Sequence, residues 1–229
     1  ADVGRTDYKK DILNKKDSVI DLIRVATYIN TIPAAIEMLE DAKKKGYETT
    51  VNIMAISTAK ESEITEALSL LSQCPVDVIY IVDSYGSMYM EQVDDLADKY
   101  LKMAEDHGKS VGMHAHNNQQ LAFANTIAAL TRGVSYLDST IGGMGRGAGN
   151  CSSEQLLGFL KNPKYDLIPI LQFLEKHIIP LKKSGVVWGY NIPYLLTGQT
   201  NQHPRSAIAA TKEKRTDFLN FLLELNDKD

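Results

Sequence analysis

Several residue types and patterns are scarce in this 229-residue chain, and each scarcity excludes a class of protein. Only two cysteines occur, Cys74 and Cys151, so no disulfide framework exists and we expect free thiols in a reducing, cytoplasmic compartment. No apolar run approaches the roughly 20 residues that cross a bilayer, so we expect no membrane association. The net charge of −4 argues against nucleic acid as a partner.

Two further features are missing at the start of the chain. It begins ADVGRTDYKK, without an initiator methionine and without the pattern of a signal peptide. The missing methionine could result from processing, or the N-terminal part of the protein could lie outside this sequence. The order of the predicted strands decides between processing and a longer protein.

Short β-rich runs alternate with amphipathic helical segments over the first 141 residues. The runs are DLIRVAT (21–27), TTVNIMAIS (49–57), VDVIYIVDS (76–84), SVGMHAH (110–116) and VSYLDSTI (134–141), and ADVG could be the tail of another. This alternation predicts βαβ units and a parallel sheet, and the residues from 150 onward predict helices. An eight-stranded barrel takes about 250 residues. The sequence therefore predicts either an open doubly wound sheet or a (β/α)8 barrel that lacks its first strands.

Polar residues cluster where the predicted strands end, which is where parallel α/β folds place their chemistry. The clearest case is VGMHAHNN (111–118), in which His114 and His116 are two residues apart. On a strand such residues share a face, about 7 Å apart along the backbone, so two imidazoles could chelate one ion. They could also be two unrelated polar residues, and a catalytic ion needs at least one more ligand.

A glycine-rich loop, IGGMGRGAGN (141–150), follows the last predicted strand. Gly143, Gly145, Gly147 and Gly149 alternate in it, and this spacing is not that of a dinucleotide-binding turn. The loop is either flexible or a backbone crossing so close to a ligand that a Cβ would collide. Asn150 lies at its end, just before a predicted helix.

Taken together, LIRVATY, IYIVDSYGSM, VGMHAHNN and GGMGRGAGN resemble, in order and spacing, the metal-dependent lyases and aldolases with a (β/α) barrel, which include HMG-CoA lyase. The resemblance covers roughly residues 1–160 and is strongest to the 4-hydroxy-2-oxovalerate aldolases. It implies a lyase that cleaves a 4-hydroxy-2-oxo acid to pyruvate and an aldehyde through an enolate stabilised by Mn²⁺ or Mg²⁺.

The resemblance also implies roles for individual residues. His114, His116 and Asn150 match metal ligands, and Thr27 and Ser84 match positions that line the substrate pocket. Gly145 and Gly147 fall in the loop that approaches the substrate, and Tyr190 or Tyr194 matches a segment that carries a catalytic tyrosine. The family's aspartate ligand and its neighbouring arginine, on the first strand, have no counterpart here. We therefore expect residues 1–160 to form roughly the third to eighth strands, and residues 161–229 to form a helical segment packed on the barrel.

Other functions stay open at this point. A Claisen-type enzyme that condenses acyl-CoA with a 2-oxo acid would share the metal site, and so would an HMG-CoA lyase-like enzyme, although the glycine-rich loop lacks the cysteine of such lyases. A Schiff-base aldolase is disfavoured because no predicted strand ends in lysine. A catalytically inactive barrel that serves as a binding module is the alternative of another class. The expected partner is a small-molecule 2-oxo acid, with a homo-oligomer as a further expectation.

Overall fold

The computed structural model describes residues 1–227, and these divide into two compact units. The first unit contains Ala1–Asp83, Glu91–Met113 and Ala129–Leu137. The second contains Ser84–Met90, His114–Ala128 and the described residues from Asp138 onward. The chain therefore passes between the units several times.

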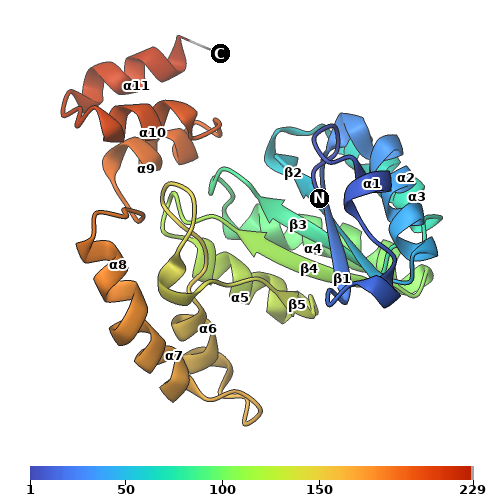
Figure 1. The fold of residues 1–229 in the computed structure, drawn as a ribbon. Helices are drawn as coiled ribbons and strands as arrows, with labels where there is room; N and C mark the ends of the chain where they lie inside the picture. The colour runs from blue at the N-terminus through green and yellow to red at the C-terminus, as the bar shows by residue number, and fades with distance from the viewer. Residues whose placement is uncertain (228–229) are drawn as a thin grey trace. The chain divides into compact units, whose positions relative to one another are not determined.

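Five parallel strands lie side by side in chain order, as Figure 1 shows. They are β1 (Leu22–Tyr28), β2 (Glu48–Met54), β3 (Val78–Asp83), β4 (Ser110–Ala115) and β5 (Tyr136–Leu137). All five predicted runs therefore form strands, although the fifth is much shorter than its predicted 134–141. The predicted strand tail at ADVG also pairs, because Asp2 makes a parallel bridge to Ala26 of β1.

A short helix precedes β1, a longer helix follows each of the first four strands, and helices make up most of the described chain after β5. They are α1 (Tyr8–Asp11), α2 (Ile32–Lys44), α3 (Glu61–Ser72), α4 (Met90–Asp106), α5 (Ala122–Arg132), α6 (Ser153–Leu160), α7 (Leu167–Phe173), α8 (Ile179–Lys183), α9 (Ile192–Gln199), α10 (Arg205–Lys212) and α11 (Phe218–Asn226). A π-helical turn, Leu174–Ile178, joins α7 to α8. Within residues 1–227, no helix combines the length and the apolar character that crossing a bilayer would take.

The core of the first unit lies along the middle of the sheet. The register places Val25 beside Val51, and Val51 beside Ile79, and all three side chains are fully buried. Helix α2 packs on β1 and β2 with a face on which Ala35 and Leu39 are completely buried. Each large apolar side chain removed from water in this way contributes about 1.5–3 kcal/mol.

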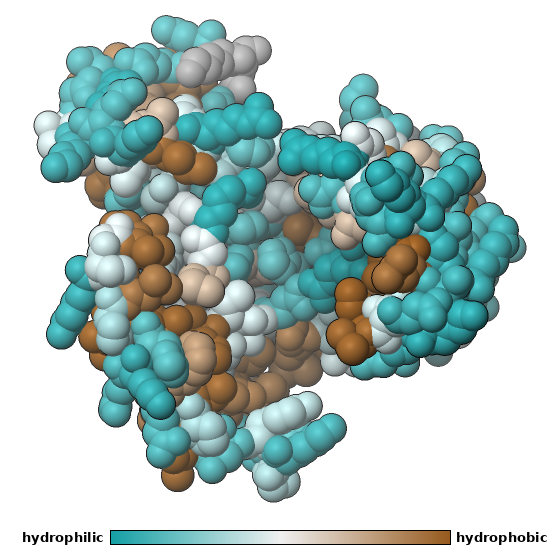
Figure 2. Space-filling model, viewed as in Figure 1, coloured by the Kyte–Doolittle hydropathy of each residue, from teal (hydrophilic) through white to brown (hydrophobic). Residues whose placement is uncertain are grey.

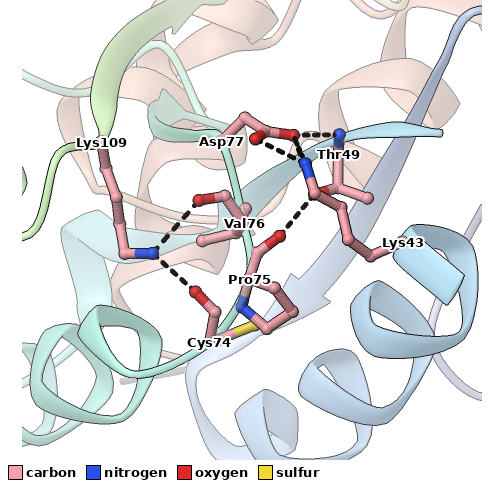
Figure 3. A network of polar contacts seen from close by, with 7 residues as sticks. All are labelled: Lys43, Thr49, Cys74, Pro75, Val76, Asp77 and Lys109. Carbon is pink, nitrogen blue, oxygen red and sulfur yellow. Dashed lines mark hydrogen bonds and ion pairs between the residues drawn. The ribbon is translucent and has the colours of Figure 1, made fainter. Parts of the chain in front are cut away.

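A polar network ties together the segments that lead into β2, β3 and β4 (Figure 3). The Asp77 carboxylate accepts hydrogen bonds from Lys43 Nζ, 2.6 Å from each oxygen, and from the Thr49 backbone N–H at 2.7 Å. Lys109 Nζ donates to the carbonyl oxygens of Cys74 and Val76 at 2.6 and 3.2 Å. Burial raises the pKa of the Cys74 thiol to about 11, so this cysteine stays protonated.

The second unit is mostly helical. Helix α9 packs on α10 and α11 around a small apolar core that contains Tyr194, Ala207, Phe221 and Leu225. Hydrophobic side chains remain on the surface over α6 to α8, seen as brown areas in Figure 2. The exposed ones on these helices include Phe159, Ile168, Leu171, Phe173 and Ile179.

Candidate metal and substrate site

The two histidines of the HAH motif lie close together at the end of β4. His114 is the fifth residue of the strand and His116 follows its last residue, so both are on one face, as predicted. Their ring centroids are 5.3 Å apart and their planes make an angle of 80°. Both residues are partly buried. The pair therefore has the spacing that binding one ion from two imidazoles requires.

The hydrogen bonds of the two imidazoles use the same ring nitrogen in each. His114 Nδ1 donates to Asp138 Oδ2 at 2.9 Å, and His116 Nδ1 donates to the carbonyl oxygen of Gly149 at 3.3 Å. A carboxylate and a carbonyl only accept, so the neutral form of each ring has its proton on Nδ1. Nε2 of each ring then carries the lone pair. This arrangement is typical of metal-binding histidines, whose second nitrogen is held by a carboxylate or carbonyl.

The surroundings of His116 keep its ring neutral. Burial, the neighbouring His114 and the charge of Arg146 lower its pKa to about 3. The hydrogen bond to Gly149 acts in the opposite direction and is too weak to compensate. Only a neutral imidazole can donate a lone pair to a cation, so His116 is ready to act as a ligand at any pH near neutrality.

The glycine-rich loop is held to the end of β4 by backbone hydrogen bonds. Asn117 N donates to the Gly149 carbonyl at 2.9 Å, and Cys151 N donates to the Ala115 carbonyl at 3.2 Å. Gly149 has a φ of +85°, and a Cβ there would lie 2.1 Å from the carbonyl oxygen of Gly143. The loop therefore folds tightly on itself beside the end of β4, in a conformation that only glycine permits.

Asn150 completes a candidate set of ligands. Its backbone makes an antiparallel bridge with His116, and its Nδ2 donates to the Met144 carbonyl at 3.1 Å. Its Oδ1 is buried and has no hydrogen-bond partner among residues 1–227. A buried oxygen without a partner costs about 1–3 kcal/mol, and a bound cation would remove that cost. The donor set of two imidazoles and one amide oxygen thus fits a divalent metal ion.

The carboxylate ligand that the family resemblance implies does not come from the described residues. No group of three or more His, Cys, Asp or Glu side chains in residues 1–227 is arranged to hold a metal ion. Asp138 accepts a hydrogen bond from Nδ1 of His114 and leaves Nε2 available to a metal ion. The sequence motifs give no sign of this role. The register shows it, because β4 and β5 pair Met113 with Leu137, and one further step places Asp138 beside His114.

The predicted substrate-binding residues fall in both units. Gly145 and Gly147 flank Arg146 in the loop, and the carbonyl oxygen of Ser84, just after β3, accepts a hydrogen bond from Arg146 at 3.1 Å. Thr27 belongs to the first unit, where its buried hydroxyl lies 2.9 Å from Thr31 Oγ1. The structure therefore brings Ser84, Gly145 and Gly147 together within the second unit.

The two candidate catalytic tyrosines have different surroundings. Tyr194, in the first turn of α9, is buried, and its ring lies against Gly147, where an added Cβ would come within 2.9 Å of it. Tyr190 precedes the helix and is 45% exposed. The position of its ring beside the loop makes Tyr194 the stronger candidate.

Comparisons with known proteins place the chain in a family. A family model described as HMGL-like matches residues 25–173, and the chain belongs to this family. It is 36% identical over 181 residues to a 4-hydroxy-2-oxovalerate aldolase from Pelotomaculum thermopropionicum, covering 75% of this chain and 52% of the relative. It is 33% identical over 228 residues to one from Thermus thermophilus, covering 95% and 63%. The chain thus spans little more than half of these relatives.

Solved structures agree with this placement. The N-terminal domain of a provisionally assigned aldolase from Bacteroides vulgatus superposes with a TM-score of 0.69 at 30% identity, covering 84% of this chain and 64% of that one. HMG-CoA lyase from Bacillus subtilis gives 0.61 at 17% identity, covering 72% and 64%. The predicted fold class, part of a (β/α)8 barrel followed by helices, is confirmed, and the open doubly wound sheet is not.

Proposed function

We propose that this chain carries the metal-binding site of a divalent-metal-dependent carbon–carbon lyase that cleaves a 4-hydroxy-2-oxo acid to pyruvate and an aldehyde. The observation that carries the proposal is the pair of imidazoles with Nδ1 engaged on both, next to the buried, unpartnered Oδ1 of Asn150. Relatives named 4-hydroxy-2-oxovalerate aldolase at 27–36% identity support the substrate class.

His114, His116 and Asn150 would hold the cation, for which Mn²⁺ or Mg²⁺ suits a set of nitrogen and oxygen donors. When bound, such an ion acts as a Lewis acid that polarises the keto group of a 2-oxo acid and stabilises an enolate. The protein contributes the orientation of the ligands. Asp138 keeps the Nδ1 proton of His114 in place, and the Gly149 carbonyl does the same for His116.

Tyr194 is the candidate for proton transfer, because its ring borders the same loop.

We further propose a cytoplasmic protein, in keeping with two buried free thiols, and a homo-oligomer. Residues 1–160 as barrel units and 161–229 as a helical segment stay our proposed division of the chain.

The thioester-lyase alternative is less well supported. The nearest thiol to the glycine-rich loop is Cys151, which is buried, and burial raises its pKa above the ordinary value. A protonated and inaccessible thiol is a poor reactive group. Activity assays distinguish the other two alternatives, the condensing enzyme and the inactive binding module, from the aldolase.

The direct test uses protein expressed from the complete reading frame and loaded with Mn²⁺. We expect it to release pyruvate from 4-hydroxy-2-oxopentanoate, detected with lactate dehydrogenase, and we expect EDTA to abolish the reaction. Release of CoA from acetyl-CoA in the presence of a 2-oxo acid, without cleavage, would indicate the condensing enzyme instead. Bound metal without either reaction would indicate a binding module.

A further inference from the structure

Trp188 is the only tryptophan of the chain, and it takes no part in the chemistry proposed above. It lies between α8 and α9 and is 7% exposed. Its indole Nε1 donates a hydrogen bond to the carbonyl oxygen of Gly142, with 2.9 Å between the two atoms. A buried indole N–H usually has such a partner. A side chain from outside the glycine-rich loop therefore holds the start of that loop.

The same indole ring also contacts the end of the loop. A Cβ added to Gly149 would lie 3.4 Å from Cδ1 of Trp188, and one added to Gly142 would lie 3.9 Å from Cζ2. The loop crosses itself at this place, because Asn150 N donates to the carbonyl oxygen of Gly143 at 3.1 Å. Trp188 therefore packs against both arms of the crossing.

The crossing carries two groups of the candidate metal site. The carbonyl oxygen of Gly149 accepts the hydrogen bond from Nδ1 of His116, and the next residue, Asn150, supplies the buried Oδ1. A displaced crossing would release the ring of His116 and move the amide of Asn150. Loss of the groups that orient metal ligands lowers the affinity for the ion. The indole is thus placed where it can control both ligands through the backbone.

The indole ring is itself held from several directions. Nζ of Lys182, in α8, lies 4.5 Å from the ring centroid, a distance at which a cation is attracted to the face of an indole. The N–H of Gly189 donates to the carbonyl oxygen of Gly147 at 3.0 Å. The π-helical turn before α8 also closes the space beside Gly142, where an added Cβ would lie 3.0 Å from one of its side chains. A ring fixed in this way can hold the loop in one conformation.

We propose that Trp188 is a positioning residue for the candidate metal site, because its indole N–H holds the loop crossing in the conformation that directs His116 and Asn150 at one cation. The inference rests on the proposed function and adds a residue that acts on the site through the loop. Coupling between two sites is reciprocal. A bound ion therefore also tightens the crossing and changes the surroundings of the indole.

The first part of the test measures Mn²⁺ affinity by isothermal titration of the complete protein. W188F keeps an aromatic ring but loses the N–H whose bond Gly142 accepts. We expect it to weaken Mn²⁺ binding by about 3- to 10-fold, within the range of one neutral hydrogen bond. The matched control is I79V, which removes a methylene group from a fully buried side chain of β3 and costs comparable stability. I79V should bind Mn²⁺ as tightly as wild type.

The second part follows the fluorescence of Trp188, which no other tryptophan of the chain obscures. Mg²⁺ is the titrant, because Mn²⁺ is paramagnetic and quenches fluorescence directly. We expect Mg²⁺ to change the emission of wild type and of I79V, and to leave the emission of H116A unchanged. A tryptophan that only fills space in the second unit would not respond to the ion.

Equal Mn²⁺ affinity in W188F and wild type would overturn the inference and leave the proposed metal site intact. Equal loss of affinity in W188F and I79V would reveal a general effect of stability and would overturn it as well. Wild-type protein that binds Mg²⁺ without any change in emission would also contradict it. If wild-type protein binds neither ion, the proposed function itself fails.

Discussion

The carboxylate of Asp138 accepts a hydrogen bond from Nδ1 of His114, with 2.9 Å between the two atoms. Both side chains are about one-fifth exposed, so the pair is shielded from bulk water without being fully buried. The bond fixes Nε2 as the nitrogen of His114 that can bind a cation. It also makes Nε2 a stronger electron-pair donor to a metal ion. Asp138 is therefore a positioning residue for the candidate metal site.

The first prediction concerns this bond. D138A should weaken Mn²⁺ binding by about 10- to 100-fold, because loss of such a partner leaves the imidazole free to rotate and less basic. D138N keeps an acceptor without the charge and should lose less. Isothermal titration with Mn²⁺ measures both variants. D166N, a like change at the N-cap of α7, is the control, and equal affinity in D138A and wild type would argue against the role.

The glycine-rich loop gives a prediction about stability. G149A should destabilise the protein by about 2–3 kcal/mol or more, because the new Cβ would lie 2.1 Å from a carbonyl oxygen and the φ of +85° disfavours alanine. Gly158 has open space around its Cβ position and lies in α6. G158A should therefore stabilise by about 0.5–1 kcal/mol. Urea unfolding of the two variants compares them, and similar destabilisation by both would show that the loop is not tightly packed.

Strand order and most of the candidate site could be predicted from periodicity and motif spacing, whereas the path after β5 could not. The predicted strand 134–141 pairs with β4 only at Tyr136 and Leu137. Beyond these residues, Thr140 N donates to the Cys151 carbonyl, so the backbone leaves the sheet to meet the end of the glycine-rich loop. A long-range pairing of this kind has no periodic signal in the sequence.

The helical region shows a second limit. The run LIPILQFLEKHIIPLKKSG predicts a helix, and α7, a π-helical turn and α8 do follow one another there without a break, but the sequence did not indicate the π-helical turn. Pro180 lies at the start of α8 and lacks the N–H that an uninterrupted helix would use. The proline was visible in the sequence. The conformation with which the chain accommodates it depends on packing, which local propensity does not describe.

Asp77 gives a prediction about pH dependence. Burial would raise the pKa of its carboxyl group, but the hydrogen bonds from Lys43 and Thr49 outweigh burial and lower the pKa below its ordinary value of 3.8. A carboxyl with a lowered pKa stabilises the fold fully above its unfolded pKa, and this contribution is lost as the pH falls through the folded value. D77N should therefore destabilise the protein by about 1 kcal/mol at pH 7, a small value because the pair is partly exposed.

The stability difference between D77N and wild type should shrink as the pH falls below about 4, where the wild-type carboxyl becomes protonated. Urea unfolding at pH 7, 5 and 3 measures it. K43M removes the other partner and should show the same trend. A difference that stays constant from pH 7 to pH 3 would mean that the charge of Asp77 is not what stabilises the network.

The candidate tyrosines can be separated by their hydroxyl groups. Y194F should lower kcat for cleavage of a 4-hydroxy-2-oxo acid by about 100-fold, the lower range for loss of a proton-transfer group. Y190F should change it by less than threefold, because Tyr190 is largely exposed. Y165F, at an exposed site, is the control. A larger loss in Y190F than in Y194F would reverse the assignment.

Metal content and enolate chemistry, measured on the same preparation, test the proposed metal site. Complete protein is purified, its bound Mn, Mg, Zn and Co are quantified, and the exchange of pyruvate methyl protons with deuterium is followed by NMR in wild type and H114A. We predict bound Mn²⁺ or Mg²⁺ and metal-dependent exchange in wild type, with both lost in H114A. Wild-type protein that binds no metal, or exchange that persists unchanged in H114A, would contradict it.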